Sequence, residues 1–459
     1  MKKILLALVI IIAVVASLPI VGNSVVDGVL KTRISVLTSN GLELKNATTE
    51  SSYLNTKKHY EFLLADGQKF IEHLNQYSDA QLPPYIDAML SGAVLGVDLE
   101  YSNFPFSSKV LVDIYPLALP TNLSEELQQE NMPFYTYVDK LLQGKGVLYH
   151  INYYISDKLF DGYIKNIDEE YIFDNGSKMI VQLFDATYYG NGSLIAPENL
   201  QTSIAKIVII ADESGEEVKF EMNELTSSFT FESQSTYLSG AAIKSISILL
   251  NEENNSKLEA SLDNIKINVS SNTQGEKAKF NAKSSIGEFK FNSKDANIGA
   301  SGFNYDISLD GVDKDSYEEF RKLTSNASAN NSPDFEYKLQ ESLKRIFSKG
   351  LSLSIADMSI KQVRIENQKP IDGFSLMAKV VLKEDADLAK KLQTAPMSLS
   401  KNLNLASTIK FSKEFYAIVN EEAPITGMAN LLVKEDGNNL VFEIKLNDGK
   451  LSVNDKAIN

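Results

Sequence analysis

Most of the chain alternates apolar and polar side chains with a period of two. The alternation is clearest over residues 374–382 and 440–446, and it recurs over 258–262, 265–269 and 303–309. The intervening positions are mostly Lys, Glu, Asp, Asn and Ser. Because successive side chains of a strand point to opposite faces, this pattern predicts antiparallel strands with one buried and one hydrated face.

Turn-forming residues separate these predicted strands. They occur at Asp174–Gly176, Gly190–Gly192, Asp212–Gly215, Asp436–Asn438 and Asn447–Gly449. Asp448-Gly449 between two alternating segments predicts a tight hairpin. The segment 251–302 alternates but is rich in Asn, Ser and Lys, so we expect weakly packed sheet there, near an edge.

Several stretches instead place apolar residues at helical spacing. They predict helices over residues 68–77, 84–90, 123–142, 314–323, 335–347 and 384–393, with a break or restart at Pro133. Together the two patterns predict an α+β fold dominated by β-structure, with an antiparallel sheet and a few packed helices.

The sequence of the N-terminal segment predicts insertion into a membrane. Lys2 and Lys3 precede an uncharged run over residues 4–22 that just reaches the length needed to cross a bilayer. The apolar residues expected to form this anchor are Ile4, Leu5, Leu8, Ile11, Val14, Leu18 and Val21. The two lysines predict a cytoplasmic N-terminus and an exported body. A cleaved signal peptide has the same polarity and stays an alternative to a transmembrane helix.

These features divide the chain into four parts. We expect a transmembrane anchor or signal segment over 1–22 and an amphipathic stalk over 23–40. A first β-rich half with helices would span 41–250 and a second 251–459. The predicted location is therefore the bacterial inner membrane, crossed once, with most of the chain in the periplasm.

Composition removes several classes of function. Sixty acidic residues against forty-five basic ones give a net charge of -15, which disfavours binding to nucleic acid. There is no cysteine, so thiolate chemistry, zinc-thiolate sites and disulfides are excluded.

Chemistry-bearing residues are few and scattered. The three histidines, His59, His73 and His150, lack the spacing of metal ligands, and paired acids such as Glu252-Glu253 lie in predicted turns. No motif of a serine hydrolase or a phosphate-binding loop stands out. We therefore predict no catalytic residues, no metal and no cofactor, and interpret the chain as a non-enzyme.

One apolar strip is a candidate for binding. The aromatic-rich region around residue 150 packs a predicted sheet, or it presents an apolar groove to a hydrophobic ligand, a lipid or a partner. The strip consists of Val147, Tyr149, Ile151 and Tyr153.

Three segments carry a family resemblance. Gly41–Asn46 is similar to a first hairpin after an anchor, Leu99–Phe106 to a short Pro-containing segment, and Leu440–Ile458 to a closing hairpin. With them the chain resembles the YdgA-like family of bacterial envelope proteins of unknown function. The usual His-Gly-Pro is not preserved, and Asp455 stands where Gly is usual. The resemblance implies an inner-membrane anchor and a long curved antiparallel sheet outside it.

Together these observations predict a membrane-anchored periplasmic protein that binds or scaffolds without catalysis. Its expected partners are the inner membrane, through the N-terminal helix, and a lipid or an envelope protein. Three alternatives stay open: an envelope hydrolase, a carrier of hydrophobic ligands with an open sheet groove, and an accessory of a membrane complex that acts through its anchor.

Overall fold

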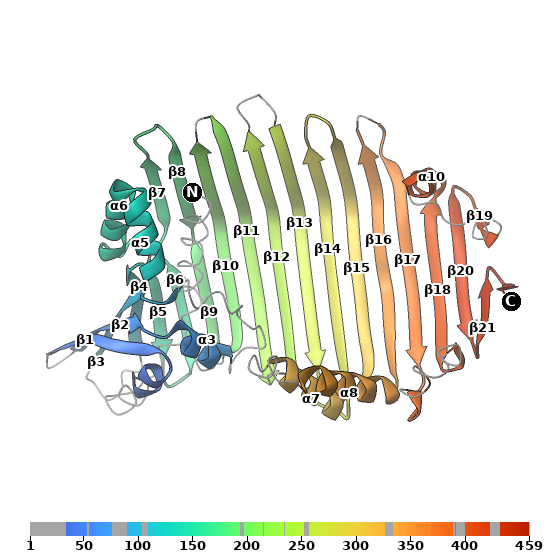
Figure 1. Cartoon of the computed structure of the whole chain (residues 1–459), viewed down its shortest axis with the longest axis horizontal. Helices are drawn as coiled ribbons and strands as arrows, with labels where there is room; N and C mark the ends of the chain where they lie inside the picture. Colours follow the sequence, from blue (N-terminus) through green and yellow to red (C-terminus); the bar gives the residue numbers. More distant parts are fainter. Residues whose placement is uncertain are drawn as a thin grey trace. The chain divides into compact units, whose positions relative to one another are not determined.

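A computed structural model gives the fold of the chain (Figure 1). It describes residues 34–52, 55–75, 90–102, 109–192, 197–213, 215–233, 235–251, 257–325, 334–366, 368–388, 391, 400–422 and 432–458. The structure divides into two compact units, Met1–Gln234 and Ser235–Asn459, which are described separately below. The expected boundaries at residues 22, 40 and 250 stay predictions.

Among its described residues, the first unit combines short strands, two long strands and several helices. Its strands are β1 (Leu42–Ser51), β2 (Asn55–Leu64), β3 (Val94–Ser102), β4 (Lys109–Ala118), β5 (Tyr149–Tyr154), β6 (Leu159–Ile164), β7 (Ile167–Ile172), β8 (Lys178–Phe184), β9 (Ala186–Gly192), β10 (Pro197–Glu213) and β11 (Glu216–Ser233). Its helices are α3 (Gly67–Asn75), α5 (Thr121–Glu130) and α6 (Met132–Gln143).

These strands form one antiparallel sheet. The pairing runs from β1 through β2, β3, β4, β5, β6 and β9 to β10 and then β11. The second part of β10 pairs with β8, which also pairs with β7. Gly190–Gly192, expected as a turn, instead lies in β9. Gly190 is required there because a Cβ atom would lie 2.2 Å from the carbonyl oxygen of Asn199 on the paired strand.

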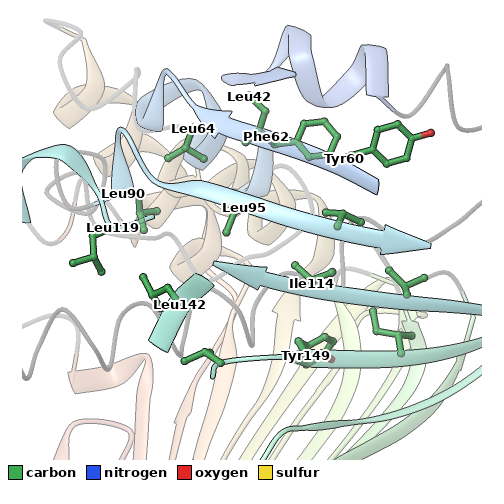
Figure 2. Packing of buried hydrophobic residues seen from close by; sticks show 14 of the residues in the cluster. Leu42, Tyr60, Phe62, Leu64, Leu90, Leu95, Ile114, Leu119, Leu142 and Tyr149 are labelled. Atoms are coloured by element: carbon green, nitrogen blue, oxygen red, sulfur yellow. The ribbon is translucent and has the colours of Figure 1, made fainter. Parts of the chain in front are cut away.

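One face of the short strands builds a closed hydrophobic core. Alternate residues of β2 to β5 point into it, and Figure 2 shows Phe62, Leu95 and Ile114 on neighbouring strands. Helix α6 closes the core with Phe134, which is fully buried, and Leu142. Burying a large apolar side chain stabilises a fold by about 1.5–3 kcal/mol, so this cluster holds the first unit together.

The second unit consists mostly of long strands. They are β12 (Thr236–Asn251), β13 (Lys257–Asn272), β14 (Lys277–Asn292), β15 (Asn297–Asp313), β16 (Leu351–Ile365), β17 (Ile371–Leu382), β18 (Leu403–Ser412), β19 (Lys434–Asp436), β20 (Asn439–Asn447), β21 (Lys450–Val453) and β22 (Lys456–Ile458). Its helices are α7 (Lys314–Ser325), α8 (Phe335–Ser348) and α10 (Lys413–Glu422).

Sequential strands of this unit pair antiparallel from β12 to β18, after which β18 pairs with β20. The segment 251–302 therefore does not form a sheet edge, because β13 and β14 have a paired strand on both sides. Most of its polar residues occupy one face, so the polar composition did not indicate an edge. Asp448 and Gly449 form the expected hairpin turn, with φ of 49° and 79°.

Neighbouring strands of this unit carry residues that the pairing register passes over at one level of the sheet. From β12 to β17 these residues include Lys244, Asn264, Gly287, Gly302, Lys361 and Gly373, which we call the register gap; between β15 and β16 the ladder also passes over Phe303 and Ile360. Pairing resumes beyond the gap because each strand contributes one such residue. Asn264 and Gly302 have left-handed backbone, with φ of 54° and 65°. A residue outside the ladder restarts the alternation of side chains, as in a β-bulge.

The helices largely follow the predictions. Helix α3 begins one residue before the predicted start. The break expected at Pro133 is confirmed: α5 ends at Glu130, Asn131 caps both helices, and α6 begins at Met132 with Pro133 in its first turn. Helices α7 and α8 match the predicted pair. The expected helix 384–393 is wrong at its start, because residues 384–387 are not helical. Helix α10 was not expected.

Little of the N-terminal prediction falls on described residues. Residues 34–39 of the expected stalk are helical, and Leu37 packs into the core of the first unit. The predicted anchor, residues 1–22, lies outside the described residues. Among the described helices, none has the length and apolar character required to cross a membrane.

Candidate functional site

The long-strand sheet of the second unit is apolar on one face. In β13 the apolar positions are even-numbered up to Leu262 and odd-numbered from Ile265, and Asn264 lies between them. The same change of parity occurs at the register gap in β14 to β17, so apolar residues on both sides of the gap share one face. We call this the apolar face: it carries Ile265, Ile286, Phe303, Ile360 and Phe374 and the residues that alternate with them.

Paired registers align these side chains across the sheet. Ile265 pairs with Ile286, which pairs with Phe303, and Ile360 pairs with Phe374, which pairs with Phe411 of β18. Apolar cross-strand pairs of this kind each stabilise a sheet by about 0.2–1 kcal/mol. The pairs therefore align apolar side chains across β13 to β15 and across β16 to β18.

The opposite face of the same strands is polar. Lys279 forms an ion pair with Asp310 at 3.2 Å, and Lys283 with Asp306 at 3.4 Å. Each pair joins β14 to β15. These exposed pairs contribute little stability, about 0–1 kcal/mol each. Their importance is that they mark the hydrated side of the sheet.

Helices cover the apolar face at its ends. Ala278 and Val312 are buried against Ile346 of α8, with Tyr317 and Phe320 of α7 packed alongside. Figure 1 shows α7 and α8 at one end of these strands and α10 at the other end of β17 and β18.

Helix α10 packs on the other end through aromatic rings. The ring of Phe415 stacks at 5.8 Å on that of Phe374, and Tyr416 is buried against Phe442. Among the described residues, the apolar clusters between helices and this face lie at these two ends.

Between the helices the apolar face stays half-buried. Ile286, Phe303 and Ile360 are neither buried nor fully exposed, whereas Ile267 is 42% exposed and Ile298 is 38% exposed. The first unit buries thirty residues in one core cluster, but the two clusters of the second unit bury three each. Among the described residues, the apolar face of the second unit thus leaves more apolar surface uncovered than the sheet of the first unit does.

The strip that was considered as an apolar groove lies in the first unit and not on the apolar face. Val147, Tyr149, Ile151 and Tyr153 are at most 4% exposed and belong to the core of the first unit. The strand β5 alternates as expected, and its apolar side faces packed side chains.

A polar row crosses the other face of the first unit's sheet. His59 of β2 pairs with Asp98 of β3, Asp98 with Asp113 of β4, and Asp113 with His150 of β5. These four residues line a groove of about 310 Å³, together with Thr48, Glu50, Lys57, Lys58, Leu99, Glu100 and Leu111.

Within the row, His59 lies between two carboxylates. Its Nδ1 is 2.7 Å from Asp98 and its Nε2 is 3.1 Å from Glu61. Burial acts to lower the pKa of His59, but the hydrogen bonds to Asp98 and Glu61 outweigh it and raise that pKa. Burial would also raise the pKa of Asp98, yet hydrogen bonds from Lys145 and His59 hold it below its usual value. Through Asp98, the His59 ring joins β2 to β3.

The geometry of this row does not suit catalysis. Both ring nitrogens of His59 are hydrogen-bonded to carboxylates, so neither is free to meet a substrate. His150 donates to Asp113 at 2.6 Å. His73 is buried in α3, apart from the row, and burial lowers its pKa. Among the described residues no group of His, Asp and Glu side chains has the geometry to hold a metal ion.

The anchor residues predicted from the sequence, Ile4, Leu5, Leu8, Ile11, Val14, Leu18 and Val21, lie outside the described part of the chain. Their role stays a prediction.

Comparison with known proteins assigns the chain to a family but gives no activity. Residues 198–459, more than half of the chain, match a family described as bacterial protein of unknown function (DUF945). No curated protein and no solved structure matches the chain. The name YdgA-like is not confirmed by this match, although an uncharacterised bacterial family is what the resemblance implied. The chain belongs to the DUF945 family of bacterial proteins of unknown function.

Proposed function

We propose that this protein is a membrane-tethered binding protein of the bacterial envelope, and that the apolar face of its second unit is the binding surface. One observation carries the proposal: five long strands present one apolar face whose middle the described helices do not cover. Large exposed apolar patches on folded proteins mark sites of interaction. No step of catalysis is required.

The size of the surface supports binding. Five strands about 4.8 Å apart and about 15 residues long, at about 3.3 Å per residue, give a whole face on the order of 1,000 Å², of which the helices cover the ends. Patches on monomeric proteins rarely exceed a few hundred Å² without a function. Covering Ile267 alone would remove roughly 70 Å² from water, a gain of about 2 kcal/mol.

Tethering and export are part of the same proposal. Lys2 and Lys3 before the apolar run of residues 4–22 support a cytoplasmic N-terminus and a periplasmic body. A hydrophobic binding surface held next to the inner membrane would be within reach of envelope lipids and of membrane-protein partners.

The absence of cysteine allows a direct test in the native host. Single cysteines at Ile267→Cys, on the apolar face, and at Lys266→Cys, its neighbour on the polar face, would be treated with a membrane-impermeant maleimide after the outer membrane is permeabilised. Both positions are exposed in the chain by itself. We expect Cys at 266 to react in cells, and Cys at 267 to react only after the protein is purified in detergent.

Two results would contradict the proposal. Equal reactivity of the two positions in cells would mean that nothing occupies the apolar face. Reaction of neither position until the inner membrane is opened would place the body in the cytoplasm.

A further inference from the structure

The chemistry of the apolar face restricts what can cover it. From β13 to β17 its positions carry aliphatic and aromatic side chains, and among the described residues its hydroxyl groups are those of Ser271, Ser284 and Tyr305. Ser271 already donates a hydrogen bond to the carbonyl oxygen of Ser235. No position of this face carries a charged side chain within these strands.

Outside the register gap the backbone offers few further hydrogen-bonding groups. Strands β13 to β17 are paired on both sides, so most of their N–H and C=O groups there are used within the sheet. A ligand that lies on the face away from the gap therefore meets mainly side chains, and nearly all of them are hydrocarbon.

A protein partner fits this surface poorly. Protein–protein interfaces contain about one hydrogen bond per 100–200 Å², so a face on the order of 1,000 Å² would be expected to form about five to ten. Three hydroxyl groups, one of them already bonded, cannot supply them. Polar backbone or side chains of a partner would be buried there without hydrogen bonds, which costs about 1–3 kcal/mol for each group.

A hydrocarbon chain has no such requirement. Along each strand, same-face side chains follow one another at about 6.6 Å, so the apolar rows extend tens of ångströms, and hydroxyl groups occur in them only at Ser271, Ser284 and Tyr305. The register gap contributes to this continuity, because the alternation restarts at Asn264, Gly287 and Gly302 and keeps the apolar side chains on one face. Without it, each row would change face halfway along its strand.

We propose that the apolar face of β13–β17 binds the hydrocarbon chains of membrane lipids. This inference rests on the proposed function, since it names the occupant of the same surface. The ligand is held by burial of its methylene groups, each worth about 0.8 kcal/mol. The polar face, with its ion pairs of Lys279 and Lys283, stays in water.

Photocrosslinking of the full chain in its native host tests this. The photoreactive residue p-benzoylphenylalanine, which inserts into C–H bonds, would replace Ile267 or Ile298 on the apolar face and, as the matched control, Lys266. Both apolar positions are exposed, so a bulky apolar replacement is tolerated without repacking a core. Circular dichroism of the purified variants checks that each has folded.

The expected result is an adduct at both apolar positions whose mass increase equals that of a membrane lipid, at least tenfold more abundant than at position 266. Alkaline hydrolysis should remove the ester-linked part of that mass. Adducts to a protein at positions 267 and 298 would overturn the lipid assignment and leave the binding surface in place. Adducts no more frequent than at position 266 would overturn both.

Discussion

The register gap gives a sharp prediction at Gly302. This residue has φ of 65°, and an added Cβ atom would lie 2.8 Å from the Cβ atom of Lys361 on the paired strand. A non-glycine residue with left-handed backbone costs about 1–2 kcal/mol, and overpacking a fixed neighbour about 1–3 kcal/mol. Alanine also lowers the conformational entropy of the unfolded chain, which stabilises the folded state by about 0.4–1 kcal/mol. Gly302→Ala should therefore destabilise the strands around it by about 3 kcal/mol.

Gly299 of the same strand provides the matched control. It has no left-handed φ, and an added Cβ atom would meet the Arg364 side chain at 3.4 Å and the carbonyl oxygen of Phe289 at 3.6 Å, which are ordinary contacts. Gly299→Ala should be neutral or stabilising by up to about 1 kcal/mol. The two variants have the same substitution in the same strand and differ in backbone requirement.

Hydrogen exchange read by mass spectrometry is the suitable assay, because a chain of two units need not unfold in one step. Amides of β14, β15 and β16 should lose about 3 kcal/mol of protection in Gly302→Ala and none in Gly299→Ala, while peptides of the first unit stay unchanged. Equal protection in the two variants would refute the claim that the gap in β15 requires glycine at position 302.

Three further predictions follow from other parts of the fold. Because the pKa of His59 is raised in the folded state, its contribution to stability is complete below the unfolded pKa of about 6.5 and is lost as pH rises through the folded pKa. The pKa of Asp98 is lowered, so its contribution is complete above about 3.9 and is lost on acidification. The unfolding temperature of His59→Gln should thus fall below that of the wild type most at pH 5 and least at pH 9; an equal difference at both pH values would argue against this reasoning. Ile151→Ala, at a fully buried position, should cost about 2–5 kcal/mol in hydrogen exchange of β5, whereas Ile267→Ala on the apolar face should cost less than about 1 kcal/mol in β13; similar losses would mean that both sites are packed. A C-terminal alkaline phosphatase fusion should be active, because that enzyme folds only after export, and an inactive but stable fusion would contradict the periplasmic assignment.

The secondary structure was predictable wherever pattern and turn chemistry agreed. Asp448-Gly449 indicated its hairpin, and the spacing of residues 335–347 indicated α8. Helix α10 was not predicted from the sequence. Helix α10 is short and begins directly after a strand, and its signal is the hydroxyl of Ser412, which accepts a hydrogen bond from the N–H of Phe415.

The candidate site was harder to recognise, for a physical reason. Leu258–Leu262 and Ile265–Val269 read as two strands, because the parity of their apolar positions differs. They are one strand, β13, interrupted by Asn264. A change of parity without a turn sequence, repeated along consecutive strands, was the available signal. This signal can be interpreted only when the strand register shows that the passed-over residues of neighbouring strands lie side by side.

Long-range pairing explains the polar row that was also missed. His59 and Asp98 lie 39 residues apart, and Asp113 and His150 lie 37 residues apart. The pattern of one strand carries no information on which distant residue pairs with it. The strip at Tyr149 illustrates the converse, since its alternation was real, but whether other elements cover it depends on tertiary packing.

A fluorescent reporter on the apolar face tests the central claim most directly. Acrylodan attached at Ile267→Cys emits at shorter wavelength when its surroundings are hydrocarbon, and Lys266→Cys provides the hydrated reference on the adjacent position. In the full chain purified with its host lipids, we expect blue-shifted emission at position 267 that moves to longer wavelength when the lipids are removed and returns when phospholipid is added back. Emission at position 267 that matches position 266 in every state would contradict a lipid-binding apolar face.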